Sequence, residues 1–240
     1  MQPARKKTFH GVTIGILMVK TTFERLPGDV GHAGTWDFPV QFRIVEEATP
    51  ERMMALDSID LVGAFTRAGL ELAAGGVDGI ATTCGFLALY QDRLAAALPV
   101  PVATSALLQA PMVSRLLPRG RRVGIMTFSR ENLSAAHLAA VGVPADTPVV
   151  GMPADSAFRR SIKGEPVPAP VAVQRAEVLA AAGRLMREHP DVGAIVSECA
   201  NLTPFSDDIS RAFGVPVYDA VTLIEWFHAG LKPRAYLPPD

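Results

Sequence analysis

The chain has 240 residues, and its 23 Lys and Arg residues against 24 Asp and Glu residues leave a formal net charge of −1. With 49% hydrophobic and 20% charged residues it can bury a substantial core, which excludes a disordered or fibrous protein. The balanced charge supplies no field to attract nucleic-acid phosphates or an anionic membrane, so we expect neither as a partner. Only two cysteines occur, Cys84 and Cys199, too few for a disulfide-stapled scaffold or a cysteine-rich metal site. The length allows one large domain or two small lobes.

Two apolar segments have some features of export or membrane signals and lack others. The run at 12–19 follows three basic residues, but Lys20 ends it and no small-x-small cleavage site follows. Residues 94–114 carry no charge, yet three prolines interrupt them, whereas a membrane-spanning helix is more uniformly apolar. We therefore expect a soluble, cytoplasmic protein.

Short runs rich in Val and Ile alternate with longer Ala- and Leu-rich stretches at helical spacing, which is typical of repeated βα units and a mainly parallel sheet. The clearest helices are predicted at 57–74, which Gly75 and Gly76 stop, and at 175–188, which Pro190 closes. Two long Gly- and Pro-rich segments, 21–39 and 152–170, are either loops over a site or surface excursions. The pattern predicts an α/β fold with strands at residues 13–19, 40–45, 79–83, 100–104, 122–127, 149–151, 194–197 and 215–218.

An internal repeat relates the two halves of the chain. A shift of 115 residues places Cys84 on Cys199 (199 − 84 = 115), with residues 79–85 (GIATTCG) on 194–200 (AIVSECA). The same shift places the Val-Pro-Val run at 100–102 on the one at 215–217. We interpret the chain as two similar α/β halves with one cysteine each, the alternative being a chance alignment of unrelated βα units.

Both cysteines follow a buried strand and precede a helix, where open α/β sheets bind their ligands. The free N–H groups at a helix start lower the pKa of a thiol and can hold a substrate carboxylate. Gly85 and Ala200 are small enough to let a ligand approach the backbone. Neutral hydrogen-bond donors near the cysteines are Thr82, Thr83, Ser197, Asn201 and Thr203.

Two acid/base groups on opposite faces of one carbon are what stereoinversion requires. One thiolate removes a proton, and the thiol on the far face delivers one. The alternatives are that both cysteines are buried small hydrophobic residues, or that they form a disulfide.

The motifs TTCG at 82–85 and SECAN at 197–201, the Val-Pro-Val run after each, and the opening IGI at 14–16 resemble the cofactor-independent aspartate/glutamate racemase superfamily. Hydantoin racemases, maleate cis-trans isomerases and arylmalonate decarboxylases also belong to it. The resemblance covers nearly the whole chain. It implies two pseudo-symmetric flavodoxin-like lobes, each with a mainly parallel sheet flanked by helices, and an active site in the cleft between them.

The same resemblance implies a division of the chain and a role for the cysteines. Residues 1–117 and 216–240 would form the first lobe and 118–215 the second, with the C-terminal helix packing back on the first. Cys84 and Cys199 would be the two bases, and no cofactor would be needed.

The sequence departs from the amino-acid racemases of that superfamily beside both cysteines. The first cysteine there is usually followed by Asn-Thr, whereas Gly85 and Phe86 follow it here, and Ala200 and Asn201 follow the second. Recognition of the substrate's amino group and side chain is therefore expected to differ. Glu198 either faces the site, where its charge would raise the pKa of the Cys199 thiol, or points to solvent or a salt bridge, which we favour.

Other constellations carry weaker signals. The five histidines have no ligand spacing, so no metal site is expected, and the serine-hydrolase, phosphate-loop and dinucleotide motifs are absent. The segment Thr127-Phe128-Ser129 either holds a carboxylate, through Ser129 and backbone N–H groups, or caps a helix. Asp29 either touches the ligand or is an ordinary turn residue, and Lys20 is either a Schiff-base lysine or a surface cation.

We therefore expect a cofactor-independent racemase or isomerase of a small carboxylate, such as an amino acid, that uses Cys84 and Cys199 for two-base proton transfer. The alternatives are a maleate-type cis-trans isomerase with a nucleophilic cysteine, and a non-catalytic relative that binds a metabolite. The resemblance also suggests a homodimer. Expected substrate contacts are Thr82, Thr83, Gly85, Phe86, Thr127, Ser129, Ala200 and Asn201.

Overall fold

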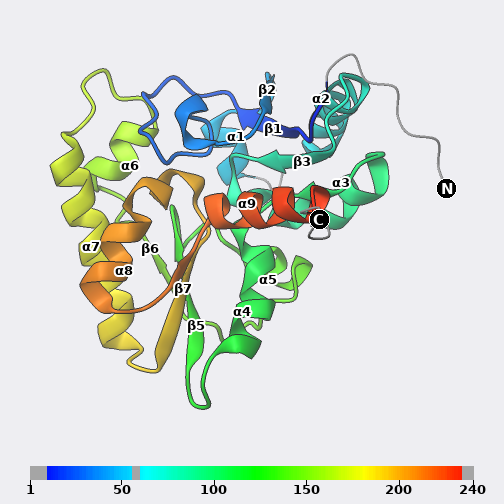
Figure 1. Cartoon of the computed structure of the whole chain (residues 1–240). Helices are drawn as coiled ribbons and strands as arrows, with labels where there is room; N and C mark the ends of the chain where they lie inside the picture. The colour runs from blue at the N-terminus through cyan, green and yellow to red at the C-terminus, as the bar shows by residue number, and fades with distance from the viewer. Residues whose placement is uncertain (1–9, 56–59, 234–240) are drawn as a thin grey trace, which may run out of the picture.

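The computed structural model describes residues 10–55 and 60–233, which form two four-stranded parallel sheets (Figure 1). The first sheet has the order β2-β1-β3-β4 and the second the order β6-β5-β7-β8, with every neighbouring pair parallel. The predicted α/β fold with two related halves is confirmed. The strands are β1 (Ile14–Val19), β2 (Val40–Val45), β3 (Gly79–Thr82), β4 (Val102–Ala103), β5 (Arg122–Thr127), β6 (Val149–Gly151), β7 (Val192–Ser197) and β8 (Val217–Tyr218).

The strand pattern was readable because parallel strands are buried on both faces and so appear as apolar runs. β2, β5 and β6 have the predicted bounds. β4 and β8 begin two residues later than predicted, each directly after a proline. These prolines have no N–H to donate, yet the Pro101 carbonyl accepts a hydrogen bond from Ile80 and the Pro216 carbonyl accepts one from Ile195.

The two long predicted helices exist with shifted starts. α2 (Val62–Ala74) begins after Leu61, whereas its predicted start at residue 57 lies outside the described residues. α7 (Val171–Glu188) starts four residues earlier than predicted, directly after Pro170. The remaining α-helices are α1 (Pro50–Met54), α3 (Gln91–Ala97), α4 (Ala110–Leu116), α5 (Ala135–Ala140), α6 (Ala157–Ile162), α8 (Ser206–Phe213) and α9 (Ala220–Leu231), and the 3₁₀ turns are η1 (Ala33–Thr35), η2 (Gly85–Tyr90), η3 (Ala106–Gln109) and η4 (Ala200–Phe205).

The shift of 115 residues seen in the sequence also relates elements of the structure. It carries η2 onto η4, since 200 − 85 and 205 − 90 are both 115, and it carries β4 onto β8. α3 and α8 follow the 3₁₀ turns in the same way. The repeat therefore extends beyond the cysteine motifs to the elements that follow them.

The last helical segment of each half packs on the sheet of the other half. η3 and α4 contact β7 and β5 of the second sheet, whereas α9 contacts β3 and β4 of the first and crosses the molecule beneath β3 in Figure 1. The expected return of the C-terminal helix to the first sheet is thus observed. The larger apolar core is shared, since it joins Ile14 and Ile80 of the first sheet to Ile125 and Val196 of the second.

The chain still belongs to the second sheet just after residue 216, where the first lobe is expected to resume. Strand β8 still pairs with β7, so Val217 and Tyr218 belong to the second sheet, and the chain crosses back only with α9. Division into two lobes near residue 117 stays a prediction. Within the described residues, no helix has the length and apolar character needed to cross a membrane.

Close packing of α9 on β3 predicts a stability difference between two glycine substitutions. Gly79→Ala should lower the free energy of unfolding by about 1 kcal/mol, because its Cβ would lie 2.7 Å from both Leu231 Cδ1 and Phe227 Cζ and the ends of these two side chains must move. Gly230→Ala, inside α9 with open space at its Cβ, should leave stability unchanged or raise it by about 0.5–1 kcal/mol. Urea unfolding followed by circular dichroism measures both. Equal stability of the two variants would contradict the tight contact.

Candidate active site

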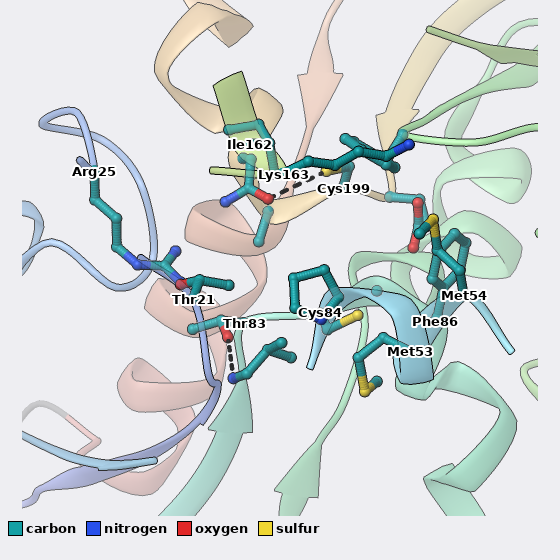
Figure 2. A pocket seen from close by; sticks show the side chains of 17 residues that line it. Thr21, Arg25, Met53, Met54, Thr83, Cys84, Phe86, Ile162, Lys163 and Cys199 are labelled. Atoms are coloured by element: carbon teal, nitrogen blue, oxygen red, sulfur yellow. Dashed lines mark hydrogen bonds between the residues drawn. The ribbon is translucent and has the colours of Figure 1, made fainter. Parts of the chain in front are cut away.

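One pocket at the carboxyl ends of the strands contains both cysteines (Figure 2). Cys84 follows β3 and Cys199 follows β7, and both are free thiols. The pocket is also lined by residues at the ends of other strands, notably Val19, the last residue of β1, and Phe128, the residue after β5. Side chains from the segments that cover it include Thr21, Arg25, Met53, Met54, Ile162 and Lys163.

Each cysteine is the residue directly before a 3₁₀ turn. Cys84 precedes η2 with φ −141° and ψ 114°, and Cys199 precedes η4 with φ −78° and ψ 120°, both extended conformations. Each turn leads directly into a helix, α3 or α8. Backbone N–H groups of Phe86 and Leu87 face the Cys84 sulfur and act to lower its pKa, as does the N–H of Asn201 for Cys199.

Burial outweighs these N–H groups, so the expected low thiol pKa values do not result. Desolvation raises the pKa of the Cys84 thiol to about 12, and the nearby charge of Glu198 adds to the effect. Burial likewise raises the pKa of the Cys199 thiol well above its usual value, again with a contribution from Glu198. Both cysteines are therefore thiols in the free protein near neutral pH.

The favoured placement of Glu198, toward solvent or a salt bridge, is wrong. Its side chain is buried, only 2% of the residue is exposed, and it lines the cysteine pocket. Thr127 donates a hydrogen bond to its Oε2 at 2.6 Å. Among the described residues no Lys, Arg or His side chain pairs with it, and burial raises its pKa to about 7.

Glu198 connects the surroundings of the two cysteines. It immediately precedes Cys199, and its backbone oxygen and Oε1 would each lie 2.2 Å from a Cβ on Gly85, the residue after Cys84. A larger residue at position 85 would displace Glu198. Gly85 is therefore needed for close approach of the two halves, whereas its repeat partner Ala200 carries a Cβ.

The structure places some of the sequence-predicted contact residues in the pocket and others behind it. Thr83, Gly85, Phe86, Ala200 and Asn201 line the pocket. The Thr83 hydroxyl accepts a hydrogen bond from the Val19 N–H at 3.2 Å, so it also joins β3 to β1. The roles of these residues toward a substrate stay predictions.

Thr82, Thr127 and Ser129 do not line this pocket. The Thr82 hydroxyl donates to the Thr104 carbonyl at 2.6 Å, and Thr127 holds Glu198. Ser129 is fully buried and donates to Asn132 Oδ1 at 2.5 Å. Phe128, which lies between Thr127 and Ser129 in the sequence, does line the pocket. These three hydroxyls support the site from behind.

Asp29 is buried, whereas Lys20 is exposed. Asp29 is buried and forms an ion pair with Arg25, Nη1 to Oδ1 at 2.6 Å, and its Oδ2 accepts a hydrogen bond from Asn201 at 2.8 Å. Lys20 is an exposed cation paired with Glu46 at 2.7 Å and does not line the pocket.

Two cationic side chains of the pocket, Arg25 and Lys163, were not predicted from the sequence. Arg25 comes from the 21–39 segment and Lys163 from the 152–170 segment, so both long segments lie over the site. A single Arg or Lys in a Gly- and Pro-rich stretch has no spacing that marks it as functional. Across residues 10–55 and 60–233, no group of three or more His, Cys, Asp and Glu side chains is arranged to hold a metal ion.

Fold and pocket together define an α/β protein with a two-cysteine site between related halves. The sequence profile of the Asp/Glu/hydantoin racemase family matches residues 43–226, and the chain belongs to that family. The resemblance noted from the cysteine motifs is thereby confirmed.

The chain is also similar to curated proteins that are named as lyases. It is 27% identical over 246 residues to "Dimethylsulfoniopropionate lyase" of Durusdinium sp. clade D, covering 97% of this chain and 80% of that one. It is 29% identical over 232 residues to "Dimethylsulfoniopropionate lyase 5" of Emiliania huxleyi, covering 90% of this chain and 45% of that one. The chain thus spans less than half of the second relative's length.

Solved structures share the fold at low sequence identity. Unliganded arylmalonate decarboxylase superposes with a TM-score of 0.59 at 18% identity, covering 96% of this chain and 97% of that one. Allantoin racemase from Klebsiella pneumoniae superposes with a TM-score of 0.61 at 16% identity, covering 92% and 87%.

Burial of Glu198 predicts a pH-dependent loss of stability. Folding raises its pKa from 4.5 to about 7, so its protonated form stabilises the folded state below pH 4.5 and this contribution is lost as the pH rises to about 7. The full loss is about 3 kcal/mol. Glu198→Gln, which is neutral and of similar size, should lack it.

Urea unfolding of both proteins between pH 4.5 and 8 measures this difference. Glu46→Gln, which removes a carboxylate from a surface ion pair, serves as the control. Parallel pH profiles for the unmodified protein and Glu198→Gln would show that Glu198 does not titrate in the folded state.

Proposed function

We propose that the chain is a lyase that removes a proton from the carbon next to a substrate carboxylate, with Cys84 and Cys199 as its proton-transfer groups. The proposed substrate is dimethylsulfoniopropionate or a closely similar β-sulfonium carboxylate. The main support is that thiols from equivalent positions of the two halves line one pocket.

High thiol pKa values fit the removal of a weakly acidic proton. A thiolate formed in this buried site is a strong base, as abstraction of a proton next to a carboxylate requires. It does not form readily, since burial and Glu198 both oppose it. A positive charge entering with the substrate would offset Glu198 and lower the cost of forming the thiolate.

A sulfonium group supplies that positive charge. Of the two cations in the pocket, Arg25 is already bound to Asp29 and Lys163 is exposed. Aromatic rings attract onium cations, and Phe86 lines the pocket together with Phe128, whose ring already has the Arg159 guanidinium over it. Apolar residues of the same wall, Met53, Met54 and Ile162, suit the methyl groups of the substrate and an uncharged sulfide product.

The elimination balances without any co-reactant. A cysteine thiolate takes the proton from Cα, and the C–H electron pair forms the Cα–Cβ double bond. The Cβ–S bond breaks, and dimethyl sulfide leaves with the bonding pair. Acrylate remains, and the proton on the thiol passes to Glu198 or to solvent.

Similarity to the named lyases favours elimination over racemisation, since it extends over at least 90% of the chain at 27–29% identity. The solved structures with this fold, arylmalonate decarboxylase and allantoin racemase, are less than 20% identical to this chain, so they support the fold alone. Racemisation of a small carboxylate is the second candidate. The equivalent positions of Cys84 and Cys199 favour it, since inversion needs one proton-transfer group on each face of the carbon.

Incubation of the full chain with dimethylsulfoniopropionate tests the first candidate. We expect dimethyl sulfide, measured by gas chromatography, and acrylate, measured by NMR, in equal amounts. Cys84→Ser and Cys199→Ser should each lower the rate by at least about 100-fold, the range of a lost general acid or base. Lys20→Ala, a surface change outside the pocket, should keep full activity.

A parallel incubation in D₂O with amino acids, hydantoins and dicarboxylates tests racemisation. Deuterium at Cα together with loss of optical rotation, and no dimethyl sulfide from the sulfonium substrate, would overturn the lyase proposal in favour of the racemase. Full lyase activity in either cysteine variant would overturn the role of that cysteine.

A further inference from the structure

The side chain of Asn201 lies between Cys199 and the buried ion pair of the covering segment. The Cys199 thiol donates to Asn201 Oδ1 across 3.8 Å, and Asn201 Nδ2 donates to Asp29 Oδ2 across 2.8 Å. Asp29 comes from the first half of the chain, and Asn201 from the second. The contact therefore ties one cysteine, and not the other, to the opposite half.

Asp29 fixes which way the Asn201 amide faces. Its Oδ1 accepts hydrogen bonds from Arg25 Nη1 at 2.6 Å and from the Gly31 N–H at 2.8 Å. A carboxylate in an ion pair only accepts hydrogen bonds. The amide nitrogen of Asn201 must then face Asp29, and its oxygen must face the sulfur.

An amide oxygen beside the sulfur distinguishes Cys199 from Cys84. It accepts a hydrogen bond from a thiol but repels a thiolate, so it favours protonated Cys199. Within the described part of the chain the Cys84 thiol has no such hydrogen-bond acceptor, and two backbone N–H groups face its sulfur, those of Phe86 and Leu87, against one for Cys199, that of Asn201. N–H groups favour the thiolate instead.

Charged groups around Cys199 act in the same direction. Asp29 and the Cys84 thiolate, when formed, oppose ionisation of Cys199, whereas Glu198 opposes ionisation of both thiols. The positive charge of Arg25 is directed at Asp29, and Lys163 lies on the pocket wall as an exposed side chain. The two thiols therefore differ although they occupy equivalent positions of the repeat.

We propose that Asn201 and Asp29 are positioning residues that hold Cys199 as a thiol, which leaves Cys84 as the group that removes the substrate proton. This assignment rests on the proposed proton-transfer function. In the elimination, Cys84 forms the new S–H bond. Cys199 keeps its proton, and its S–H turns from Asn201 Oδ1 to the substrate carboxylate as negative charge develops there.

Alkylation of the full chain by iodoacetamide, followed for each cysteine by mass spectrometry over a pH series, tests the asymmetry. Asn201→Leu keeps a similar volume but removes the amide oxygen. It should raise the alkylation rate of Cys199 by about tenfold at pH 8, equivalent to a pKa lowered by about one unit, and change that of Cys84 less than about twofold. Asp29→Asn should act in the same direction.

Two further variants keep the result interpretable. Glu198→Gln should speed alkylation of both cysteines, because the Glu198 charge acts on both, and Glu46→Gln should change neither. Equal acceleration of both cysteines by Asn201→Leu, or none at all, would overturn the positioning role.

Proton exchange assigns the base directly. The probe is a carboxylate with a β-trimethylammonium group, which leaves less readily than a sulfide. Its Cα protons should still exchange with D₂O in Cys199→Ser, more slowly than in the unmodified protein, and should not exchange in Cys84→Ser, and the reverse would overturn the assignment. The alkylation result does not depend on substrate. A protein that shows the asymmetry without releasing dimethyl sulfide would therefore disprove the proposed function, and one that releases it without the asymmetry would disprove only this inference.

Discussion

The contact of Glu198 with Gly85 is the constraint on which the site depends. A carboxylate that is nearly inaccessible to solvent lies against the backbone of the other half, with a threonine hydroxyl as its hydrogen-bond donor and no cation paired with it among the described residues. Burial of such a group is costly, and proteins retain that cost mainly at functional sites. Burial, with a contribution from the charge of Glu198, keeps both thiols protonated, so both sulfur atoms are neutral in the free protein and a charged ligand would change their pKa values.

Much of the fold follows from local pattern. Strands buried on both faces appear as apolar runs, and the exact spacing between the two cysteine motifs predicts the repeat that η2 and η4 display. Elements that a local apolar run defines were predicted well, since β5 and β6 have their predicted bounds. α6 was missed, because it is a six-residue helix within a segment rich in Gly and Pro.

The site was less predictable, because its decisive contacts join distant parts of the chain. Both cysteines and Asn201 were found from their position after a strand. Glu198 was misplaced because charged side chains are almost never fully buried, so the general expectation favoured solvent. Asn201, which donates a hydrogen bond to Asp29, lies 172 residues from it in the sequence, and no pattern within either segment indicates this contact. Arg25 and Lys163 reach the pocket only through the path of two irregular segments.

The exchange of the last helical segments has a consequence for the origin of this architecture. Each half covers only part of its own sheet, with α2 on the first and α7 on the second, and the last helix of each half packs on the other sheet: α4 on the second and α9 on the first. A single half would expose an apolar sheet face, and two identical copies would bury it by exchanging these helices with each other. The present chain has the form of such a pair joined end to end. Joining frees the two copies to diverge, so that a symmetric pair of thiols can become an unequal one, with Gly85 on one side and Ala200 on the other.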